Sequence, residues 1–298
     1  MGERDLKGRP VADRILGEVK TEIDCLKTEG WTPKLISITV GDVSDVDVYV
    51  RNQQRNAERV GIEFENRRYP ADVTQDEMKI GIETMNVDPR VTGIILQRPM
   101  PPQISIKALQ SAVHPYKDVE GLNPASIGNI VYNELDLAPC TAAASVELLR
   151  HTNLPLEGLE VVVIGHSEIV GKPIAFLLMG EGATVTVCHH MTRSVPIHSR
   201  RADAIFVAVG KPRLITGDMI KPGAAVIDIG INVETSDDGE RVVGDVDYDS
   251  AAEVAGWITP VPGGVGPVTV AMLMHNTLIA LKKQKEAYSK TFAPRAMR

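Results

Sequence analysis

A short turn with a glycine at each end follows the apolar stretch 161–164. It reads Gly165-His-Ser-Glu-Ile-Val-Gly171. A glycine turn that leads into a helix exposes backbone N–H groups, and such groups bind the phosphates of a dinucleotide. Ser167 stands where the common G-x-G-x-x-G fingerprint has its second glycine. Since two glycines in a strand–helix turn can also serve close packing alone, the turn by itself leaves both interpretations open.

The next apolar stretch, 184–188, ends without a carboxylate. NAD-binding sites often place an Asp or Glu there to bond the ribose 2′-hydroxyl. The chain continues instead with basic side chains: His189, His190, Arg193, Arg200 and Arg201. These residues favour a 2′-phosphate, and hence NADP, unless they only form a solvated helix face. Because adjacent strand residues point to opposite faces, we expect the two histidines not to share an ion, and we predict no metal site.

Strands and helices alternate along the chain, which predicts an α/β fold with parallel sheets. Short apolar runs predict strands at 35–40, 91–96, 161–164, 184–188, 204–209 and 224–229. Helical spacing of apolar residues predicts helices at 11–26, 49–60, 142–151, 172–179 and 268–283. The first two strands and the last four fall into separate stretches, so we expect two units.

Composition restricts the class of protein. A chain of 298 residues suits two domains, and 43% hydrophobic with 24% charged residues is the mixture of a globular protein. We expect no membrane span, because no run of 18 apolar residues occurs, and no signal peptide, because the first ten residues are charged. The net charge of −7 disfavours nucleic acid as a partner. Three scattered cysteines indicate reduced thiols and a cytoplasmic protein.

Several motifs occur in order along nearly the whole chain. They are Val40-Gly-Asp with Tyr49-Val, Gly93-Ile-Ile-Leu-Gln-Arg-Pro-Met-Pro101, Lys117-Asp-Val-Glu-Gly121, Pro139-Cys-Thr141, the segment 163–173, and Ile258-Thr-Pro-Val-Pro-Gly-Gly-Val-Gly-Pro267. Together they resemble the bifunctional methylenetetrahydrofolate dehydrogenase/methenyltetrahydrofolate cyclohydrolase family. The resemblance implies a folate-binding catalytic domain over 1–141, completed by the C-terminal helix 269–298. It implies a Rossmann-like NAD(P)-binding domain over 142–268, and a homodimer.

Site residues follow from the resemblance by position. Tyr49 is expected to pack against the aminobenzoyl ring, Gln97 to line the reaction centre and Glu120 to hold the pterin edge. The remaining substrate contacts are expected at Arg98, Pro260, Pro262, Gly263 and Gly264, with the last four walling a cleft between the domains. The nucleotide contacts are expected at Gly165, His166, Ser167, Ile169, Val170, Gly171, His190, Arg193 and Ile231.

Three residues depart from the family pattern around one pocket. Gln53 stands where the family has the lysine of a Tyr-x-x-x-Lys motif, Glu120 where it usually has Asp, and Arg98 where it usually has an apolar residue. Hydride transfer from the methylene carbon to a nicotinamide needs geometry and no general base. Hydrolysis of the methenyl product needs a proton acceptor, and a glutamine amide is not one near neutral pH.

We therefore expect an enzyme that oxidises 5,10-methylenetetrahydrofolate with NADP, NAD not being excluded, and has weak or absent cyclohydrolase activity. Three alternatives stay open: a full bifunctional enzyme, a non-catalytic folate-binding relative, and a dehydrogenase for another pterin carrier or small substrate. Arg98 and Glu120 are the residues that would reshape the pocket in the last case.

Overall fold

The structure is a computed structural model that describes residues 5–42, 44–134, 137–236 and 239–292. The chain forms two compact α/β units, which confirms the predicted two-domain fold class. Unit 1 comprises Met1–Arg14, Ile130–Glu134 and Pro139–Met272. Unit 2 comprises Ile15–Asn129, Leu135–Ala138 and Leu273–Arg298.

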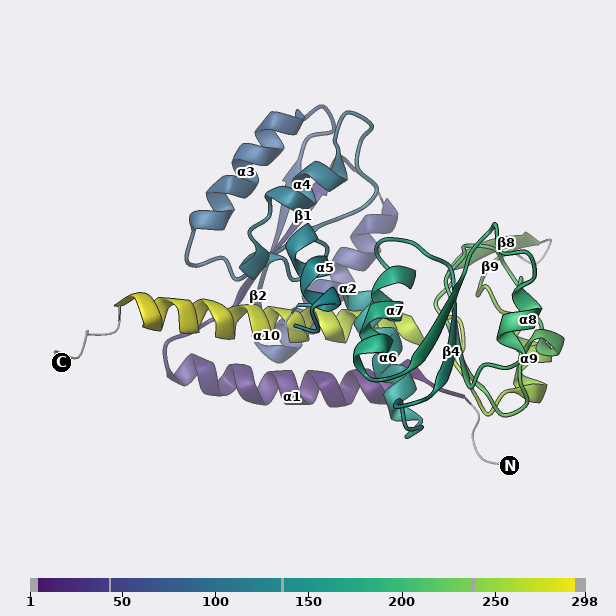
Figure 1. The fold of residues 1–298 in the computed structure, drawn as a ribbon. Helices are drawn as coiled ribbons and strands as arrows, with labels where there is room; N and C mark the ends of the chain where they lie inside the picture. Colours follow the sequence, from purple (N-terminus) through teal and green to yellow (C-terminus); the bar gives the residue numbers. More distant parts are fainter. Residues whose placement is uncertain (1–4, 43, 135–136, 237–238, 293–298) are drawn as a thin grey trace, which may run out of the picture. The chain divides into compact units, whose positions relative to one another are not determined.

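Unit 1 is built on a parallel sheet of five strands in the order β10-β7-β6-β4-β5 (Figure 1). The strands are β4 (Glu160–Ile164), β5 (Thr184–Cys188), β6 (Ala204–Val207), β7 (Ala225–Asp228) and β10 (Trp257–Ile258). The crossover between β4 and β6 places β4 beside β5 on one side and beside β6 on the other. The turn after β4 therefore lies at the point where the strand order reverses, which is the usual ligand site of such sheets.

Helices cover both faces of this sheet. Figure 1 shows α6 (Cys140–His151) and α7 (Gly171–Gly180) on one face and α8 (Val195–Ser199) and α9 (Tyr248–Val254) on the other. Strand side chains such as Val162, Ile205 and Val226 are buried in the apolar core. An antiparallel hairpin completes the unit, with strands β8 (Asn232–Ser236) and β9 (Gly239–Val243).

The buried carboxylate of Asp245 holds the loop that follows β6. Its two oxygens accept hydrogen bonds from the backbone N–H groups of Val209, Gly210 and Lys211 at 2.6, 2.9 and 2.9 Å. The side-chain amide of Asn232 donates to the same carboxylate at 2.9 Å. One internal anion thus joins this loop to the base of the β8–β9 hairpin.

A second buried carboxylate, Asp228, ends β7. It accepts hydrogen bonds from the N–H groups of Gly230, Asp245 and Val246 at 2.9, 3.0 and 2.9 Å. Burial raises the pKa of Asp228 to about 6, with a further rise from the charge of Asp245. Ile231 lies in the chain between Gly230, which bonds to Asp228, and Asn232, which bonds to Asp245. Its side chain is 60% exposed.

Unit 2 contains a smaller parallel sheet in the order β2-β1-β3, with β1 (Lys34–Val40), β2 (Glu63–Tyr69) and β3 (Gly93–Leu96). A parallel bridge from Ile94 to Asp118 continues this sheet beyond β3. Its core contains Ile36, Ile38, Ile82 and Ile94. The remaining helices are α1 (Gly8–Thr28), α2 (Ser44–Val60), α3 (Gln75–Val87), α4 (Ile106–Ala112), α5 (Pro124–Val131) and α10 (Val265–Phe292), with 3-10 turns at Pro115–Lys117 and Gly217–Met219.

Helix α10 is long and apolar enough, by length and composition, to cross a membrane, although the sequence holds no unbroken apolar run of that length. However, 61% of its most apolar window is buried inside the structure. Within unit 2, Asn276 on this helix donates side-chain hydrogen bonds to the carbonyls of Val119 and Ala138, both at 2.9 Å. These contacts are those of a core helix.

Candidate active site

The glycines that bound the turn after β4 leave no space for a side chain. Gly165 has φ +117°, and a Cβ there would lie 2.2 Å from the carbonyl oxygen of Ala208. A Cβ on Gly171 would lie 2.0 Å from the carbonyl oxygen of Gly165. Both positions therefore require glycine for close packing, whatever else the turn does.

The turn also presents backbone donors. The hydroxyl oxygen of Ser167 accepts from the N–H groups of Val170 and Gly171 at 3.2 and 3.4 Å. Within the described ranges, the N–H groups of His166, Ser167 and Ile169 donate to no protein acceptor. Unpaired N–H groups just before the first turn of α7 fit a phosphate of a dinucleotide.

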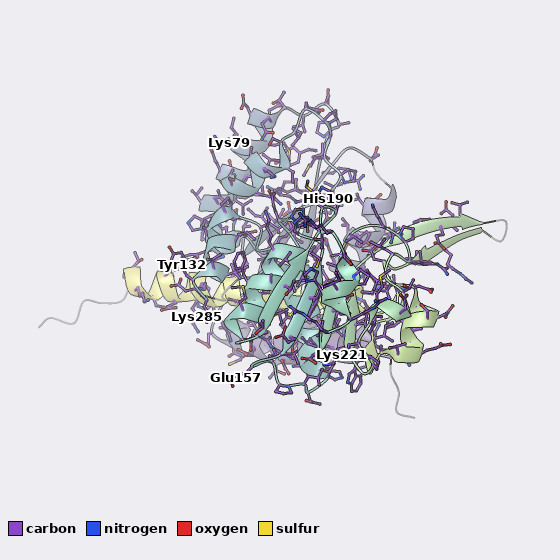
Figure 2. The ribbon with its side chains drawn as sticks, turned by 45° about the vertical axis from the view of Figure 1, so that its right-hand side comes forward. Lys79, Tyr132, Glu157, His190, Lys221 and Lys285 are labelled. Atoms are coloured by element: carbon purple, nitrogen blue, oxygen red, sulfur yellow. The ribbon has the colours of Figure 1, made fainter. Side chains whose placement is uncertain are left out.

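Three imidazoles gather beside this turn. The ring of His166 stacks on that of His189 with centroids 4.7 Å apart, and both rings lie 5.9 Å from that of His190, which is labelled in Figure 2. We refer to these three residues as the histidine cluster. The expectation that opposite strand faces separate His189 from His190 is wrong, because β5 ends at Cys188 and both residues lie beyond it. In the part of the chain that the structure describes, no three His, Cys, Asp or Glu side chains are arranged to hold a metal ion.

The other basic residues after β5 divide into two kinds. Arg200 donates to the carbonyl of Asp218 at 2.7 Å and pairs with its carboxylate at 3.1 Å, so it is engaged within the protein. Arg193 is exposed next to the histidine cluster in sequence. Arg193 is therefore better suited than Arg200 to meet a ligand.

The Pro260–Gly264 segment follows β10 in unit 1. Pro262 and Gly263 are exposed, while Gly264 is buried against the start of α1. The N–H of Gly8 donates to the carbonyl of Gly263 at 2.9 Å, and a Cβ on Gly8 would lie 1.8 Å from the carbonyl oxygen of Gly264. This packing fixes the backbone of the segment.

In unit 2, two glutamines meet where β3 ends. Gln97 follows β3 directly, and its Nε2 donates to Gln53 Oε1 at 2.6 Å and to the hydroxyl oxygen of Ser37 at 2.9 Å. Gln53 lies on α2 four residues after Tyr49, so both side chains emerge on one helix face. Gln97 is buried, Gln53 is partly buried and Tyr49 is 56% exposed, which gives the site a polar floor and an aromatic rim.

Glu120 lies beside this pair. Its Oε2 accepts a hydrogen bond from the N–H of Leu96 at 2.9 Å. Burial raises the pKa of Glu120 to about 7, the Leu96 N–H opposes this rise, and the charges of Asp118 and Arg98 act in opposite directions. Arg98 itself is exposed. The structure thus brings Gln53, Gln97 and Glu120 to the carboxyl end of β3, and Glu120 can change charge near neutral pH.

Two further residues of the 117–121 motif, Lys117 and Asp118, are buried and hydrogen-bonded within unit 2. Lys117 is buried and donates from Nζ to the carbonyls of Met85 and Asp88 at 2.8 and 2.6 Å, and burial lowers its pKa to about 8. Asp118 accepts from the N–H of Asn123 and the hydroxyl of Ser126, each at 2.7 Å. In the sequence, Lys117 and Asp118 stand out only as part of the 117–121 motif, and the signal for Ser37 is a lone serine in an apolar strand.

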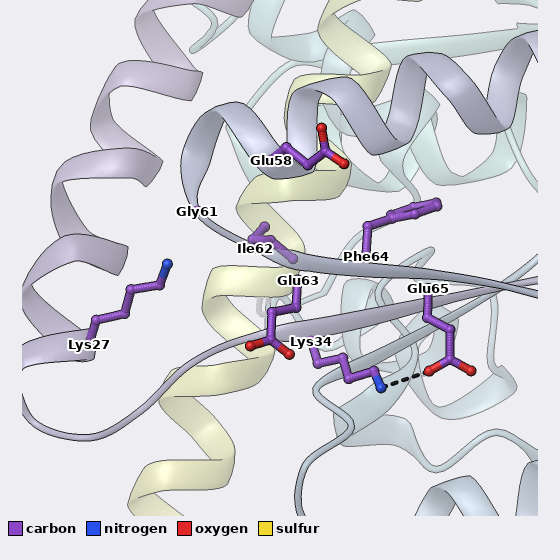
Figure 3. Close-up of a pocket in the computed structure, with 8 residues that line it drawn as sticks. All are labelled: Lys27, Lys34, Glu58, Gly61, Ile62, Glu63, Phe64 and Glu65. Atoms are coloured by element: carbon purple, nitrogen blue, oxygen red, sulfur yellow. Dashed lines mark ion pairs between the residues drawn. The ribbon is translucent and has the colours of Figure 1, made fainter.

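A surface pocket of about 540 Å³ lies elsewhere in unit 2 (Figure 3). Lys34 and Glu63, the first residues of β1 and β2, line it, and Lys34 pairs with Glu65 at 2.7 Å. It therefore opens at the amino ends of the strands, opposite to the edge where Gln97 and Glu120 lie. Ligands of parallel sheets bind at the carboxyl ends, so we do not assign the reaction to this pocket.

Comparison with known proteins identifies the family to which both parts of the chain are similar. The catalytic domain of the tetrahydrofolate dehydrogenase/cyclohydrolase family matches residues 6–120, and the NAD(P)-binding domain of the same family matches residues 139–285. A bifunctional protein FolD 2 of Mesorhizobium japonicum is 68% identical over 290 residues, which cover 97% of this chain and 95% of that protein.

Solved structures of this kind are also similar. A bifunctional FolD methylenetetrahydrofolate dehydrogenase/cyclohydrolase from Campylobacter jejuni has a TM-score of 0.88 at 37% identity, covering 93% of this chain and 98% of its own. The FolD of Trypanosoma brucei, in complex with NADP and an inhibitor, has a TM-score of 0.87 at 39% identity, covering 93% of this chain and 96% of its own. The chain therefore belongs to the tetrahydrofolate dehydrogenase/cyclohydrolase family, with a folate as substrate and NADP(H) bound by its Rossmann-like domain.

Proposed function

We propose that this enzyme oxidises 5,10-methylenetetrahydrofolate to the methenyl form with NADP, and hydrolyses the methenyl product only weakly. The observation that carries the proposal is the hydrogen bond between the carboxamides of Gln53 and Gln97. Among the described residues, the side chains of this pair bond only each other and Ser37, and none of the three is a base near neutral pH. The position that the family pattern gives to a proton-accepting lysine thus holds an amide.

The oxidation step requires no acid or base from these side chains. Bound NADP supplies the hydride acceptor, C4 of its nicotinamide. The carbon that loses hydride becomes a cation shared by two nitrogens, so no side chain has to remove a proton. Ser37 and Gln53 hold the Nε2 group of Gln97, which leaves its Oε1 as an acceptor toward the folate. Orientation of the reacting carbons is then the main contribution of the protein.

Hydrolysis makes a larger demand. Water has to add to the methenyl carbon and lose a proton, and loss of a positioned proton acceptor typically costs ~10²–10⁴-fold in rate. Arg98 stays protonated and does not replace the acceptor. We therefore expect the two activities, which are coupled in bifunctional relatives, to separate in this chain.

An absorbance assay tests the proposal. Purified protein is given methylenetetrahydrofolate with NADP or NAD, and reduced nicotinamide and methenyl product are followed together, in a buffer that does not itself open the methenyl ring. Methenyl accumulation at nearly the rate of nicotinamide reduction supports the proposal. Hydrolysis as fast as oxidation contradicts it, and absence of nicotinamide reduction would favour a non-catalytic folate-binding relative.

A full bifunctional enzyme is the second candidate, and one observation favours it besides the names of the relatives. Glu120 has a pKa of about 7 and lies at the same strand end as Gln97. Such a carboxylate could accept the proton that a lysine accepts elsewhere. If hydrolysis is fast in the wild type and lost in Glu120→Gln, Glu120 is the base.

For Glu120 we propose a different role, which is to hold the pterin. Its ionised carboxylate would accept hydrogen bonds from the 2-amino group and a ring N–H, while Tyr49 packs against the aminobenzoyl ring. The extra methylene relative to Asp would shift the pterin or repack one wall. Arg98 is exposed beside it and contributes to the shape of this pocket.

We propose a preference for NADP over NAD in this chain, since no carboxylate follows β5 and the histidine cluster with Arg193 does. The turn donors of His166, Ser167 and Ile169 support phosphate binding next to it. The ratio of kcat/KM for the two coenzymes measures the preference, and a clear advantage for NAD would contradict it. A cytoplasmic homodimer, as the family resemblance implies, is part of the same proposal, and analytical ultracentrifugation measures the dimer.

A further inference from the structure

Glu120 stands in a short turn, residues 117–121, that two other side chains hold. A parallel bridge at Asp118 binds the turn to β3. The turn closes on itself, because the N–H of Gly121, which has φ +71°, donates to the carbonyl of Asp118 at 3.1 Å. The position of the Glu120 carboxyl beside the N–H of Leu96 therefore depends on the shape of this turn.

The carboxylate of Asp118 is the first of the two side chains. It is 5% exposed, and its Oδ2 accepts from the N–H of Asn123 and the hydroxyl of Ser126, each at 2.7 Å. Burial raises the pKa of Asp118, and the Ser126 hydroxyl with the N–H groups of Asn123, Leu122 and Gly121 opposes this rise. Since these partners are all donors, they fit an ionised carboxylate. One buried anion thus organises the chain that leaves the turn.

The amide of Asn276 is the second, and it acts on the other side of Glu120. From α10 its Nδ2 donates to the carbonyls of Val119 and Ala138, both at 2.9 Å. Asn276 is 2% exposed, and an amide carries no charge. A neutral group therefore holds the residue before Glu120, and a charged group holds the residues after it.

Two charges act on Glu120, and they oppose each other. The charge of Asp118 raises the pKa of Glu120, and the charge of Arg98, in the segment after β3, lowers it. Gln53, the α2 side chain that bonds at this strand end, is uncharged, and the Nζ of Lys117 is bonded to backbone carbonyls. Asp118 is thus linked to Glu120 by its charge as well as by the backbone.

We propose that Asp118 is a positioning residue of the folate site, whose buried carboxylate holds the turn that presents Glu120 to the pterin. The inference rests on the proposed pterin role of Glu120 and names the group that acts through it. The negative charge of Asp118 also opposes a second negative charge on Glu120, so loss of the first favours the second. Asn276 holds the same turn without a charge, which allows the two effects to be separated.

Asp118→Asn should change folate binding in two ways. An amide oxygen accepts hydrogen bonds less strongly than a carboxylate does, so the turn is held less well and folate affinity at pH 8.5 should fall about tenfold. Removal of the charge favours ionised Glu120, so the pH at which affinity is half its maximum should move down from about 7 by roughly half a unit or more. A substitution that only loosened the fold would lower the affinity and leave this midpoint in place.

Calorimetric titration of the whole enzyme between pH 5.5 and 8.5 measures both quantities. The ligand is 5-formyltetrahydrofolate, which carries the pterin and aminobenzoyl groups but has no methylene bridge that could donate hydride. Asp72→Asn changes an exposed carboxylate of the same unit and should match the wild type. An unchanged midpoint in Asp118→Asn would make Asp118 a structural residue only and would overturn the proposal.

Two further variants test the proposal even if Asp118→Asn folds poorly. Ser126→Ala removes one donor and keeps the carboxylate, so it should lower folate affinity about threefold and leave the midpoint in place. Asn276→Ser removes the neutral group, so it should also lower the affinity without moving the midpoint. Unchanged affinity in Ser126→Ala would show that the turn does not depend on this carboxylate, and the proposal would fall.

Glu120→Gln separates failure of the inference from failure of the proposed function. If this variant binds the folate as well as the wild type does at every pH, the pterin role of Glu120 is wrong. If it abolishes the midpoint near pH 7 while Asp118→Asn leaves that midpoint in place, Glu120 holds the pterin and only the inference is wrong. If methylenetetrahydrofolate is not oxidised with either coenzyme, the proposed activity is wrong, while the binding titrations still decide the role of Asp118.

Discussion

The two proposed sites of this enzyme consist of different kinds of chemical groups. In unit 2, the proposed folate site contains two uncharged amides, Gln53 and Gln97, and a carboxyl group of pKa about 7, Glu120. In unit 1, the nucleotide turn offers free backbone N–H groups and exposed imidazoles. An amide pair does not gain or lose a proton near neutral pH, so a single substitution of lysine by glutamine can remove the proton acceptor that hydrolysis needs. The exposed imidazoles of His166 and His190 can contact a ligand from solvent.

The proposed folate site has a pH dependence of its own. If Glu120 holds the pterin as a carboxylate, as we propose, binding requires a pH above its pKa of about 7. Folate binding should therefore be weaker below about pH 7 than above it.

The largest expected effect comes from Gln53→Lys. A lysine at this position donates to Gln97 instead of accepting from it, so the Gln97 amide has to turn, and a proton acceptor enters the site. We expect methenyl hydrolysis to rise by about 10²-fold while oxidation changes little. Decay of methenyl absorbance above the spontaneous rate measures it, with Asn52→Lys at the preceding, exposed position of α2 as the control. Equal effects of the two variants would remove Gln53 from the argument.

Glu120→Gln should have the next largest effect, and it should move two quantities in opposite directions. Folate affinity should fall by about 5- to 150-fold, since a partly buried carboxylate acceptor is replaced by a mismatched amide, which costs ~1–3 kcal/mol. Calorimetry with the folate measures this loss, and unchanged affinity would remove Glu120 from the pterin site. Glu63→Gln, on the pocket at the other end of the sheet, is the control.

The free energy of unfolding should rise in the same variant. Because the folded-state pKa of Glu120 is about 7 and its ordinary value is 4.5, the folded protein binds this proton more tightly than the unfolded chain. Stability is therefore lost as pH rises from about 4.5 to about 7, and the full cost persists above. At pH 8, the free energy of unfolding of Glu120→Gln should exceed that of the wild type by ~1–3 kcal/mol, and at pH 4 the two should be equal. Urea titrations at the two pH values measure the difference.

A smaller effect is expected for the wild type alone. Between pH 6 and 8, the dissociation constant of the folate should fall about tenfold as Glu120 ionises. The carboxylate that is proposed to accept hydrogen bonds from the pterin forms only above the Glu120 pKa of about 7. Titration at constant ionic strength measures it. A dissociation constant that rises over this range would indicate that the pterin binds the neutral carboxyl.

The smallest effect belongs to the pocket at the amino ends of β1 and β2. Its Lys34–Glu65 pair is partly exposed, and such pairs contribute ~0–1 kcal/mol. Lys34→Met should therefore change the free energy of unfolding by less than ~1 kcal/mol and leave folate and nucleotide affinity unchanged. A loss of folate affinity would instead place a ligand site in this pocket.

Elements with a clear period were predictable from the sequence. The strand predicted at 184–188 matches β5 to the residue, and the helix predicted at 142–151 differs from α6 by two residues at its start. Strand β2 was missed because Glu-Phe-Glu-Asn-Arg-Arg-Tyr is largely polar, as suits an edge strand with one side in solvent. Helix α3 was missed although Thr74 and Glu77 form a capping box that marks its start.

The site was predictable in its residues and not in its contacts. The spacing of Tyr49 and Gln53 and the position of Gln97 came from motifs, but the hydrogen bond between the glutamines joins residues 44 positions apart. The histidine cluster shows the limit most clearly. It depends on the path of the chain after Cys188 and on the approach of His166 from the turn after β4, and the local sequence pattern contains neither.

The internal anion of Asp245 has a consequence for the motions of unit 1. Three successive N–H groups, those of Val209, Gly210 and Lys211, belong to no helix or strand, yet all are bound to a carboxylate with no exposed surface. Their hydrogens should exchange with deuterated solvent as slowly as those of the neighbouring sheet, since opening them requires breaking the carboxylate's contacts together. An irregular segment next to the nucleotide turn would then behave as part of the rigid framework, and the slow step in coenzyme exchange would have to lie elsewhere in the molecule.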